Sequence, residues 1–231
     1  TIANSIQSSD LVKYYKNASG FSADVNVANA NVTFSINGIN YTKTTDEKGT
    51  AYLNINLRPG TYNITTFFNG INKTNTVTVL STITGGNLVK YYKNGTEFYA
   101  KFVKGNGEAL ANRNVTFNIN GVFYTRETDS KGIAKLNINL RPGNYILTAT
   151  DPETGLDIGF DITVLPTIIA ENLTTYLNAS QFNASFVKGN GNPLSNTNVT
   201  FNINGVFYIC QSDDNGLATL NINLMPGKYI I

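Results

Sequence analysis

Apolar and polar residues alternate along most of the chain with a period of two. In the segment NVTFNING (114–121), Val115, Phe117 and Ile119 share one side of an extended chain, and polar residues occupy the other. The same alternation recurs in FYAKF (98–102) and KLNINL (135–140). Successive side chains of a strand point to opposite faces, so this pattern is typical of half-buried β-strands. No segment shows a convincing helical period, and we expect an all-β fold.

The alternating segments belong to three copies of one unit. NVTF segments begin at Asn31, Asn114 and Asn198, at spacings of 83 (114 − 31) and 84 (198 − 114), and the LNINL segments keep the same spacings. Such self-similarity predicts a tandem array. We expect repeat boundaries that give domains 1–81, 82–166 and 167–231. The first has a shortened turn at Ala28–Ala30 before its NVTF segment, and the third lacks a counterpart of the last strand, GLDIGFDITVL (155–165).

Turn residues separate the predicted strands. Asn-Gly pairs follow each NVTF segment, TDSKG-like turns come next, and Pro-Gly closes the following corner. In the second repeat this predicts strands near 87–93, 96–104, 113–119, 122–128, 133–140, 143–150 and 157–165. About seven short strands at this spacing favour an antiparallel β-sandwich of immunoglobulin type. The fold class expected is therefore tandem immunoglobulin-like antiparallel β-sandwiches.

The linkers between repeats are short and apolar, as in Thr82-Ile83 and Thr167-Ile168-Ile169, and they predict docked neighbours. The truncated third repeat has three explanations that stay open at this point. The sequence is an excerpt of a longer array, the third repeat borrows a strand from a neighbour by strand addition, or the third repeat is only partly ordered.

Composition excludes several classes of function. The net charge is +2 with scattered Lys and Arg, which gives no electrostatic footprint for nucleic acid or an anionic membrane. No apolar run approaches the ~20 residues of a membrane helix, so we expect no membrane insertion in this segment. The chain has no His and one Cys. Nucleophilic catalysis with a histidine base is therefore excluded, and we expect no enzyme, no cofactor and no metal site.

The run from NLVKYYKN (87–94) through NVTFNING to LNINLRPGNY (136–145) resembles the immunoglobulin-like repeats of adhesin-like surface proteins of methanogenic archaea. It is more distantly similar to bacterial Ig-like and Cna B-type surface repeats. The resemblance covers essentially the whole chain. It implies exposure at the extracellular cell surface, tandem arrays that carry a distal tip, contact with other cells or surfaces, and no enzymatic activity.

Asn-x-Ser/Thr sequons are the clearest chemical signal, and in a surface protein they are acceptors for N-glycans. A chain this rich in Asn and Thr also produces sequons by chance. We expect some to be used, with loop sites first. The candidates are Asn17, Asn94, Asn178, Asn63, Asn72, Asn172 and Asn183.

A second chemical hypothesis is an internal cross-link between a strand lysine and an asparagine. Period two puts Lys13 on the core face with Leu11 and Tyr15, and a buried unpaired ammonium is costly. Asn75 shares a face with Val77 and is the candidate partner. The alternative is the opposite register of this strand, in which the lysine is solvated.

The sequence thus predicts a non-enzymatic surface protein whose repeats form a stalk or fibre that projects an adhesive tip or mediates cell contact. Its expected partners are neighbouring repeats or subunits of the same protein, and surface glycans or proteins of a host or partner cell. Two alternatives remain. One is a module that binds glycan or cell wall, for which the shortened turn of the first repeat is the distinctive loop. The other is a fibre subunit assembled by strand donation into the incomplete third repeat.

Overall fold

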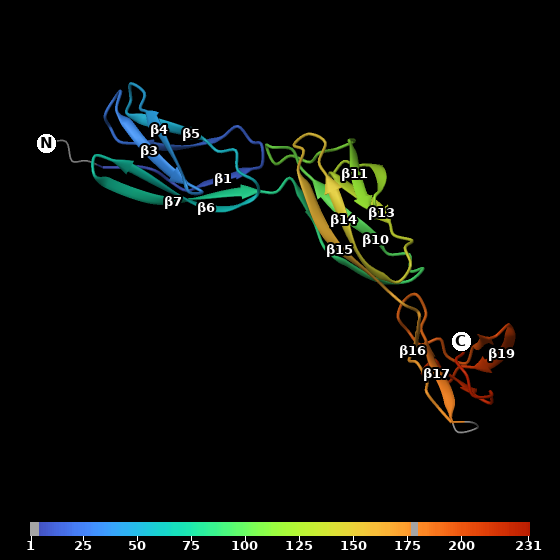
Figure 1. Ribbon diagram of the computed structural model, residues 1–231. Helices are drawn as coiled ribbons and strands as arrows, with labels where there is room; N and C mark the ends of the chain where they lie inside the picture. The colour runs from blue at the N-terminus through green and yellow to red at the C-terminus, as the bar shows by residue number, and fades with distance from the viewer. Residues whose placement is uncertain (1–4, 177–179) are drawn as a thin grey trace. The chain divides into compact units, whose positions relative to one another are not determined.

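The computed structural model describes residues 5–176 and 180–231, and within them the chain forms β-strands and turns (Figure 1). None of the described residues belongs to a helix long and apolar enough to cross a membrane. By compactness the chain divides into two units, one made of 1–86, 99–135 and 148–159, the other of 87–98, 136–147 and 160–231. The predicted all-β fold of tandem sandwiches is confirmed, whereas the repeat boundaries after 81 and 166 stay a prediction.

The first repeat contains a five-stranded sheet in the order β1-β7-β6-β3-β4 and a two-stranded sheet, β2-β5. Its pairs are antiparallel except β1 with β7, where Leu11 lies opposite Val77 and Tyr14 opposite Leu80 in parallel register. This parallel pair departs from the purely antiparallel sandwich that was predicted. The strands are β1 (Leu11–Tyr14), β2 (Gly20–Asp24), β3 (Asn31–Ile36), β4 (Ile39–Thr44), β5 (Thr50–Asn54), β6 (Gly60–Phe68) and β7 (Ile71–Leu80).

The second repeat has the same plan, with sheets β12-β11-β14-β15-β9 and β13-β10-β8. Its strands match the seven predicted ones, and β8 is an addition, because the linker after the first repeat pairs with β10. The strands are β8 (Ile83–Gly85), β9 (Leu88–Tyr91), β10 (Glu97–Phe102), β11 (Asn114–Ile119), β12 (Val122–Glu127), β13 (Ile133–Asn137), β14 (Gly143–Thr150) and β15 (Asp157–Leu165).

The third repeat has sheets β16-β17-β20 and β18-β19. Among the described residues β18 pairs with β19 alone, whereas β3 of the first repeat has β4 and β6 on its two sides. Residues 222–231 form no strand, so the described part lacks counterparts of both β14 and β15. The strand-donation hypothesis stays a prediction. The strands are β16 (Ile168–Ala170), β17 (Gln181–Phe186), β18 (Asn198–Ile203), β19 (Val206–Gln211) and β20 (Leu217–Asn221).

In every repeat a phenylalanine of the NVTF strand packs against a phenylalanine of the facing sheet. The ring centroids of Phe21 and Phe34 are 5.7 Å apart, and the equivalent pair of the third repeat, Phe182–Phe201, lies at 5.9 Å. In the second repeat Phe102 and Phe117 lie 6.2 Å apart. The second partner of each pair lies in the NVTF strand (β3, β11 or β18), and the first lies in the facing sheet of the same repeat (β2, β10 or β17). Edge-to-face and tilted ring pairs at these distances add to the free energy of burial. The inward-facing residues that the period of two predicted therefore form the cores.

Candidate functional site

A polar groove lies on the second repeat and has a volume of about 590 Å³. Its side chains come from three places: the loop that leads into β11, the end of β12, and the loop 151–156 between β14 and β15. We call it the polar groove, and its lining residues are Asn112, Arg113, Asn114, Glu127, Pro152 and Glu153.

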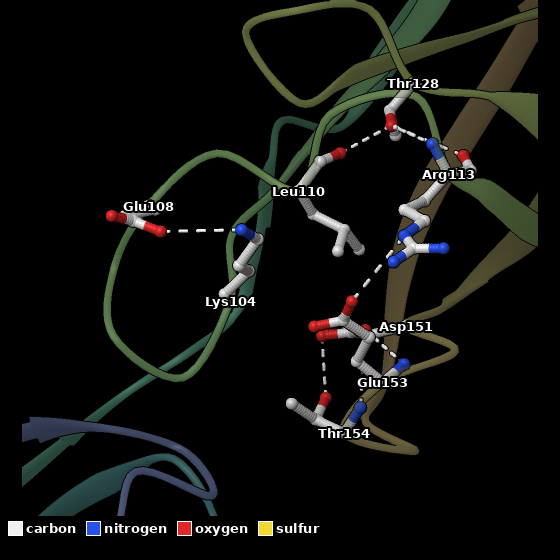
Figure 2. A network of polar contacts seen from close by, with 8 residues as sticks. All are labelled: Lys104, Glu108, Leu110, Arg113, Thr128, Asp151, Glu153 and Thr154. Atoms are coloured by element: carbon white, nitrogen blue, oxygen red, sulfur yellow. Dashed lines mark hydrogen bonds and ion pairs between the residues drawn. The ribbon is translucent and has the colours of Figure 1, made fainter.

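The loop 151–156 is built around the buried carboxylate of Asp151 (Figure 2). The hydroxyls of Thr82 and Thr154 donate to its Oδ2 at 2.6 and 2.7 Å, and the amide of Glu153 donates to Oδ1 at 2.9 Å. A buried charge is costly unless it is hydrogen-bonded, and here three donors satisfy it. The carboxylate therefore fixes the loop's conformation and holds Glu153 at the groove.

The opposite wall is positioned by Thr128, whose hydroxyl donates to the carbonyl of Leu110 and accepts from the amide of Arg113 at 3.1 Å (Figure 2). Across the groove, Arg113 Nε lies 3.8 Å from Glu153 Oε1, with the side chains 64% and 38% exposed. Exposed ion pairs of this kind contribute about 0–1 kcal/mol. The pair is weak, so the guanidinium remains accessible to solvent and to a ligand.

The lining of the polar groove offers little for recognition of a small molecule. Ligand pockets are mostly apolar and aromatic with a few polar groups, and the six lining residues include no aromatic side chain. Within the described residues, no group of three His, Cys, Asp or Glu side chains is placed to hold a metal ion. The groove can exchange hydrogen bonds with a polar ligand but has no ring on which a sugar could stack.

We expect no saturable binding of neutral oligosaccharides by the polar groove. Isothermal titration of the 231-residue chain with a panel of cell-wall oligosaccharides checks this expectation. The matched variants are Arg113→Ala in the groove and Arg58→Ala outside it. A saturable heat signal that Arg113→Ala abolishes and Arg58→Ala retains would contradict the expectation and establish a glycan site.

Sequence reasoning missed this loop. It gave the distinctive loop to the shortened turn of the first repeat, whereas the loop that supports a groove belongs to the second. The signal was present: β6 and β7 join through the two-residue turn Asn69-Gly70, and DPETGL (151–156) takes the place of that turn in the second repeat. An inserted segment that begins Asp-Pro and has a threonine three residues after the aspartate is a recognisable signal for a hydrogen-bonded loop.

The candidate sequons fall into two groups. Asn63, Asn72 and Asn183 are exposed residues of strands β6, β7 and β17, and Asn172 is exposed in the segment before β17, outside any strand. In the partly buried Asn17 and Asn94, by contrast, Nδ2 donates a hydrogen bond to a main-chain carbonyl: Asn17 to Gly105 at 2.7 Å, and Asn94 to Gly189. Asn178 lies outside the described residues.

These contacts change the expected order of glycan occupancy. Transfer of a glycan needs a free Nδ2 with open space around it, which Asn172 offers and which Asn17 and Asn94 lack in the folded chain. We expect higher occupancy at Asn172 than at Asn17 or Asn94. Mass spectrometry of glycopeptides, after secretion from a host that attaches N-glycans, measures the occupancies. Full occupancy of Asn17 and Asn94 with an empty Asn172 would refute this order.

The structure does not bring Lys13 and Asn75 together. Lys13 lies opposite Val79 in the β1–β7 ladder, four residues along the strand from Asn75, or roughly 13 Å at the usual rise. Lys13 is buried, as the core-face interpretation predicted, and its Nζ donates to the carbonyls of Ser19 and Ile55, each at 2.8 Å. Asn75 contacts Ser8 and Asp10 instead. The arrangement has no geometry for an amide bond between the two residues.

Asn75 has its own role in the first repeat. Its Nδ2 donates to Asp10 Oδ1 at 3.0 Å, and the amide of Thr76 donates to the same oxygen at 2.9 Å. These hydrogen bonds, with a smaller contribution from the charge of Lys73, lower the pKa of the Asp10 carboxyl below its usual value. The cluster fastens the segment before β1 to the middle of β7.

No protein-family model matches the chain, and no curated protein is similar to it in sequence. Among solved structures, the I9–I11 tandem of titin is 15% identical and aligns over 95% of this chain and 89% of its own, with a TM-score of 0.39. The glycan-locus protein SGBP-B of Bacteroides ovatus, solved with a mixed-linkage heptasaccharide, is 15% identical over 96% of this chain and 59% of its own (TM-score 0.25). A Ca²⁺-stabilized, ice-binding adhesin of an Antarctic bacterium is 17% identical over 91% and 63% (TM-score 0.24).

Proposed function

We propose that the chain is part of a non-enzymatic extracellular protein in which tandem immunoglobulin-like repeats form a stalk at the cell surface, as in the adhesin-like proteins of methanogens. The stalk projects an adhesive tip or mediates cell contact. The observation that carries the proposal is what the repeats have in common. Each has a phenylalanine pair between its sheets and the same series of turns, and the first and second repeats share the strand order of their five-stranded sheet. The polar groove, by contrast, depends on a loop of the second repeat alone. Repetition of a scaffold without repetition of a site is typical of spacers.

The polar solvent faces of the strands support the same proposal. Asn alternates with buried Leu and Ile in the LNINL segments, so these strands are apolar inside and polar outside. Polar faces of this kind stay in contact with water, so contacts with other proteins are limited to the ends of the array and the edges of its sheets. The partners proposed are neighbouring repeats of the same protein and, through a tip, surface glycans or proteins of another cell.

Surface labelling of the native cells tests this proposal. Antibodies raised against the folded 231-residue chain should stain intact cells, and brief protease treatment of those cells should remove the signal while a cytoplasmic marker stays intact. Staining that appears only after the cells are permeabilised would refute the extracellular stalk. Hydrolysis or transfer activity in the purified chain would refute its non-enzymatic nature.

A further inference from the structure

Two turns on successive repeats touch each other, and the same contact occurs twice in the chain. The first is the YYKN turn, residues 14–17 in the first repeat and 91–94 in the second. The other is the KGNG turn, residues 104–107 in the second repeat and 188–191 in the third. Residues 14–17 and 104–107 belong to one compact unit, and residues 91–94 and 188–191 belong to the other.

The contact combines one hydrogen bond with one aromatic ring. Asn17 Nδ2 donates to the carbonyl of Gly105 at 2.7 Å, and Asn94 repeats this bond to Gly189. Next to it, the ring of Tyr14 lies so close to Gly107 that a Cβ on the glycine would be 2.6 Å from the ring's Cε2. At the second contact, a Cβ on Gly191 would be 2.7 Å from Tyr91 Cε2. Only glycine permits this approach of the ring.

The YYKN turn holds its asparagine in position before any partner arrives. The amide of Asn17 donates to the carbonyl of Tyr14 at 3.0 Å, and Asn17 Oδ1 accepts from the amide of Ser19 at 2.8 Å. Asn94 makes the same two bonds, to Tyr91 and from Thr96. The oxygen of each side chain is therefore used within its own repeat, and the nitrogen is left to point outward. Such preorganisation lowers the entropic cost of docking.

The KGNG turn is also complete within its own repeat. Gly107 N donates to the carbonyl of Lys104 at 2.9 Å, and Lys104 N donates to that of Glu108 at 2.8 Å. In the third repeat Gly191 and Lys188 form the equivalent bonds. The turn does not use the carbonyl of Gly105 or of Gly189 for these bonds, so that oxygen is available to accept from the asparagine.

The distribution of the two turns along the sequence follows the contacts. The YYKN turn occurs in the first and second repeats, each of which precedes another repeat, and the KGNG turn occurs in the second and third, each of which follows one. The first repeat has no KGNG turn between β2 and β3, and the third reads YLNA (176–179) in place of YYKN. Each turn forms its internal hydrogen bonds without the other, so the contact between the two turns is not explained by the folding of either repeat.

We propose that the YYKN and KGNG turns are the two halves of a docking joint, and that the partner each YYKN turn recognises is the KGNG turn of the next repeat. Asn17 and Asn94 are then docking residues. A glycan on either Nδ2 would occupy the place of the next repeat's turn, so docking and modification exclude each other there. The joint does not depend on where the protein resides, and its test is separate from that of the proposed function.

Substitution of the asparagine by aspartate isolates the joint. Asn17→Asp keeps the oxygen that accepts from Ser19, removes the donor to Gly105 and sets a carboxylate against a carbonyl oxygen. Asn94→Asp does the same at the second contact. Asn37→Asp, in the exposed Asn-Gly hairpin of the first repeat, is the matched control for charge. Thermal unfolding of each variant verifies that the repeats remain folded.

Rotational correlation times from ¹⁵N relaxation of the full chain provide the measurement. In the wild type, amides of adjacent repeats should share one long correlation time. Asn17→Asp should shorten that of the first repeat alone, and Asn94→Asp that of the third repeat alone, while Asn37→Asp leaves all values unchanged. Independent tumbling of the repeats in the wild type, unchanged values in both joint variants, or an equal effect of Asn37→Asp would overturn the docking joint.

Discussion

Replacing Gly132 by alanine is expected to destabilise the second repeat by about 2–5 kcal/mol, the sum of left-handed backbone strain and overpacking. Gly132 has a φ of +77°, and a Cβ there would lie 2.3 Å from the carbonyl oxygen of Phe102 and 3.1 Å from the amide nitrogen of Leu110. Neither atom can move freely, because Phe102 N donates to Gly132 O at 2.8 Å and Leu110 N donates to Phe102 O at 3.0 Å. The added methyl group would disrupt two backbone hydrogen bonds at the edge of the core.

Gly121→Ala is the matched control for this substitution. Gly121 has nearly the same φ, +74°, but a Cβ there would meet nothing within 4 Å. It should cost only the backbone strain, about 1–2 kcal/mol. Native-state hydrogen exchange with mass spectrometry, resolved by peptide, reports the stability of the second repeat in each variant. Equal losses for the two variants would mean that the close approach to Phe102 is relaxed in solution and that the turn has no packing role.

The sequence predicted the strands well because their information is local. Alternation in FYAKF and NVTFNING assigns each side chain to a face, and the structure buries Phe98, Phe102 and Phe117 as that alternation requires. The same argument placed Lys13 on the core face. Alternation does not determine which other strand a given strand pairs with in the sheet. The parallel pairing of β1 with β7 and the pairing of the linker strand β8 with β10 arise from contacts distant in sequence.

The candidate sites were less predictable for the same reason. Whether Lys13 meets Asn75 depends on the register between β1 and β7, and four residues of offset along β7 separate them. Likewise, the sequons of Asn17 and Asn94 resemble ordinary acceptor sites until the turn of the following repeat is placed against them. The three-residue sequon is the sequence that a glycosylating enzyme recognises, but whether the asparagine Nδ2 is accessible depends on the tertiary structure.

Lys90→Met is the second substitution with a large expected effect. The buried ammonium of Lys90 donates to the carbonyls of Thr96 and Ile138, each at 2.8 Å. Lys90 belongs to β9 of the larger sheet, whereas its acceptors flank β10 and β13 of the smaller one, so the side chain links the two sheets. Methionine fills a similar volume but leaves both carbonyls without this donor. Each buried unsatisfied group costs about 1–3 kcal/mol, partly offset because no ammonium is desolvated.

The effect should depend on pH in a defined direction. Burial lowers the pKa of Lys90 below its usual value, an effect that the nearby carboxylate of Glu97 partly opposes. Between the lowered folded pKa and the unfolded value of about 10.4, the unfolded chain binds more protons than the folded one. Wild-type stability from this group therefore rises as the pH increases through that window, and it is lost as the pH falls through the folded pKa. The neutral amine still has hydrogens to donate to both carbonyls.

The difference in unfolding free energy between wild type and Lys90→Met should thus widen as the pH is raised from 7 towards the ordinary lysine pKa of about 10.4. Urea denaturation at a series of pH values measures it, with hydrogen exchange assigning the loss to the second repeat. Lys101→Met, at an exposed position of β10, controls for loss of a positive charge and should change stability by no more than about 0.5 kcal/mol. A difference that stays constant with pH would mean that the ammonium is hydrated in the folded state, and a stabilised Lys90→Met would mean that its desolvation outweighs both hydrogen bonds.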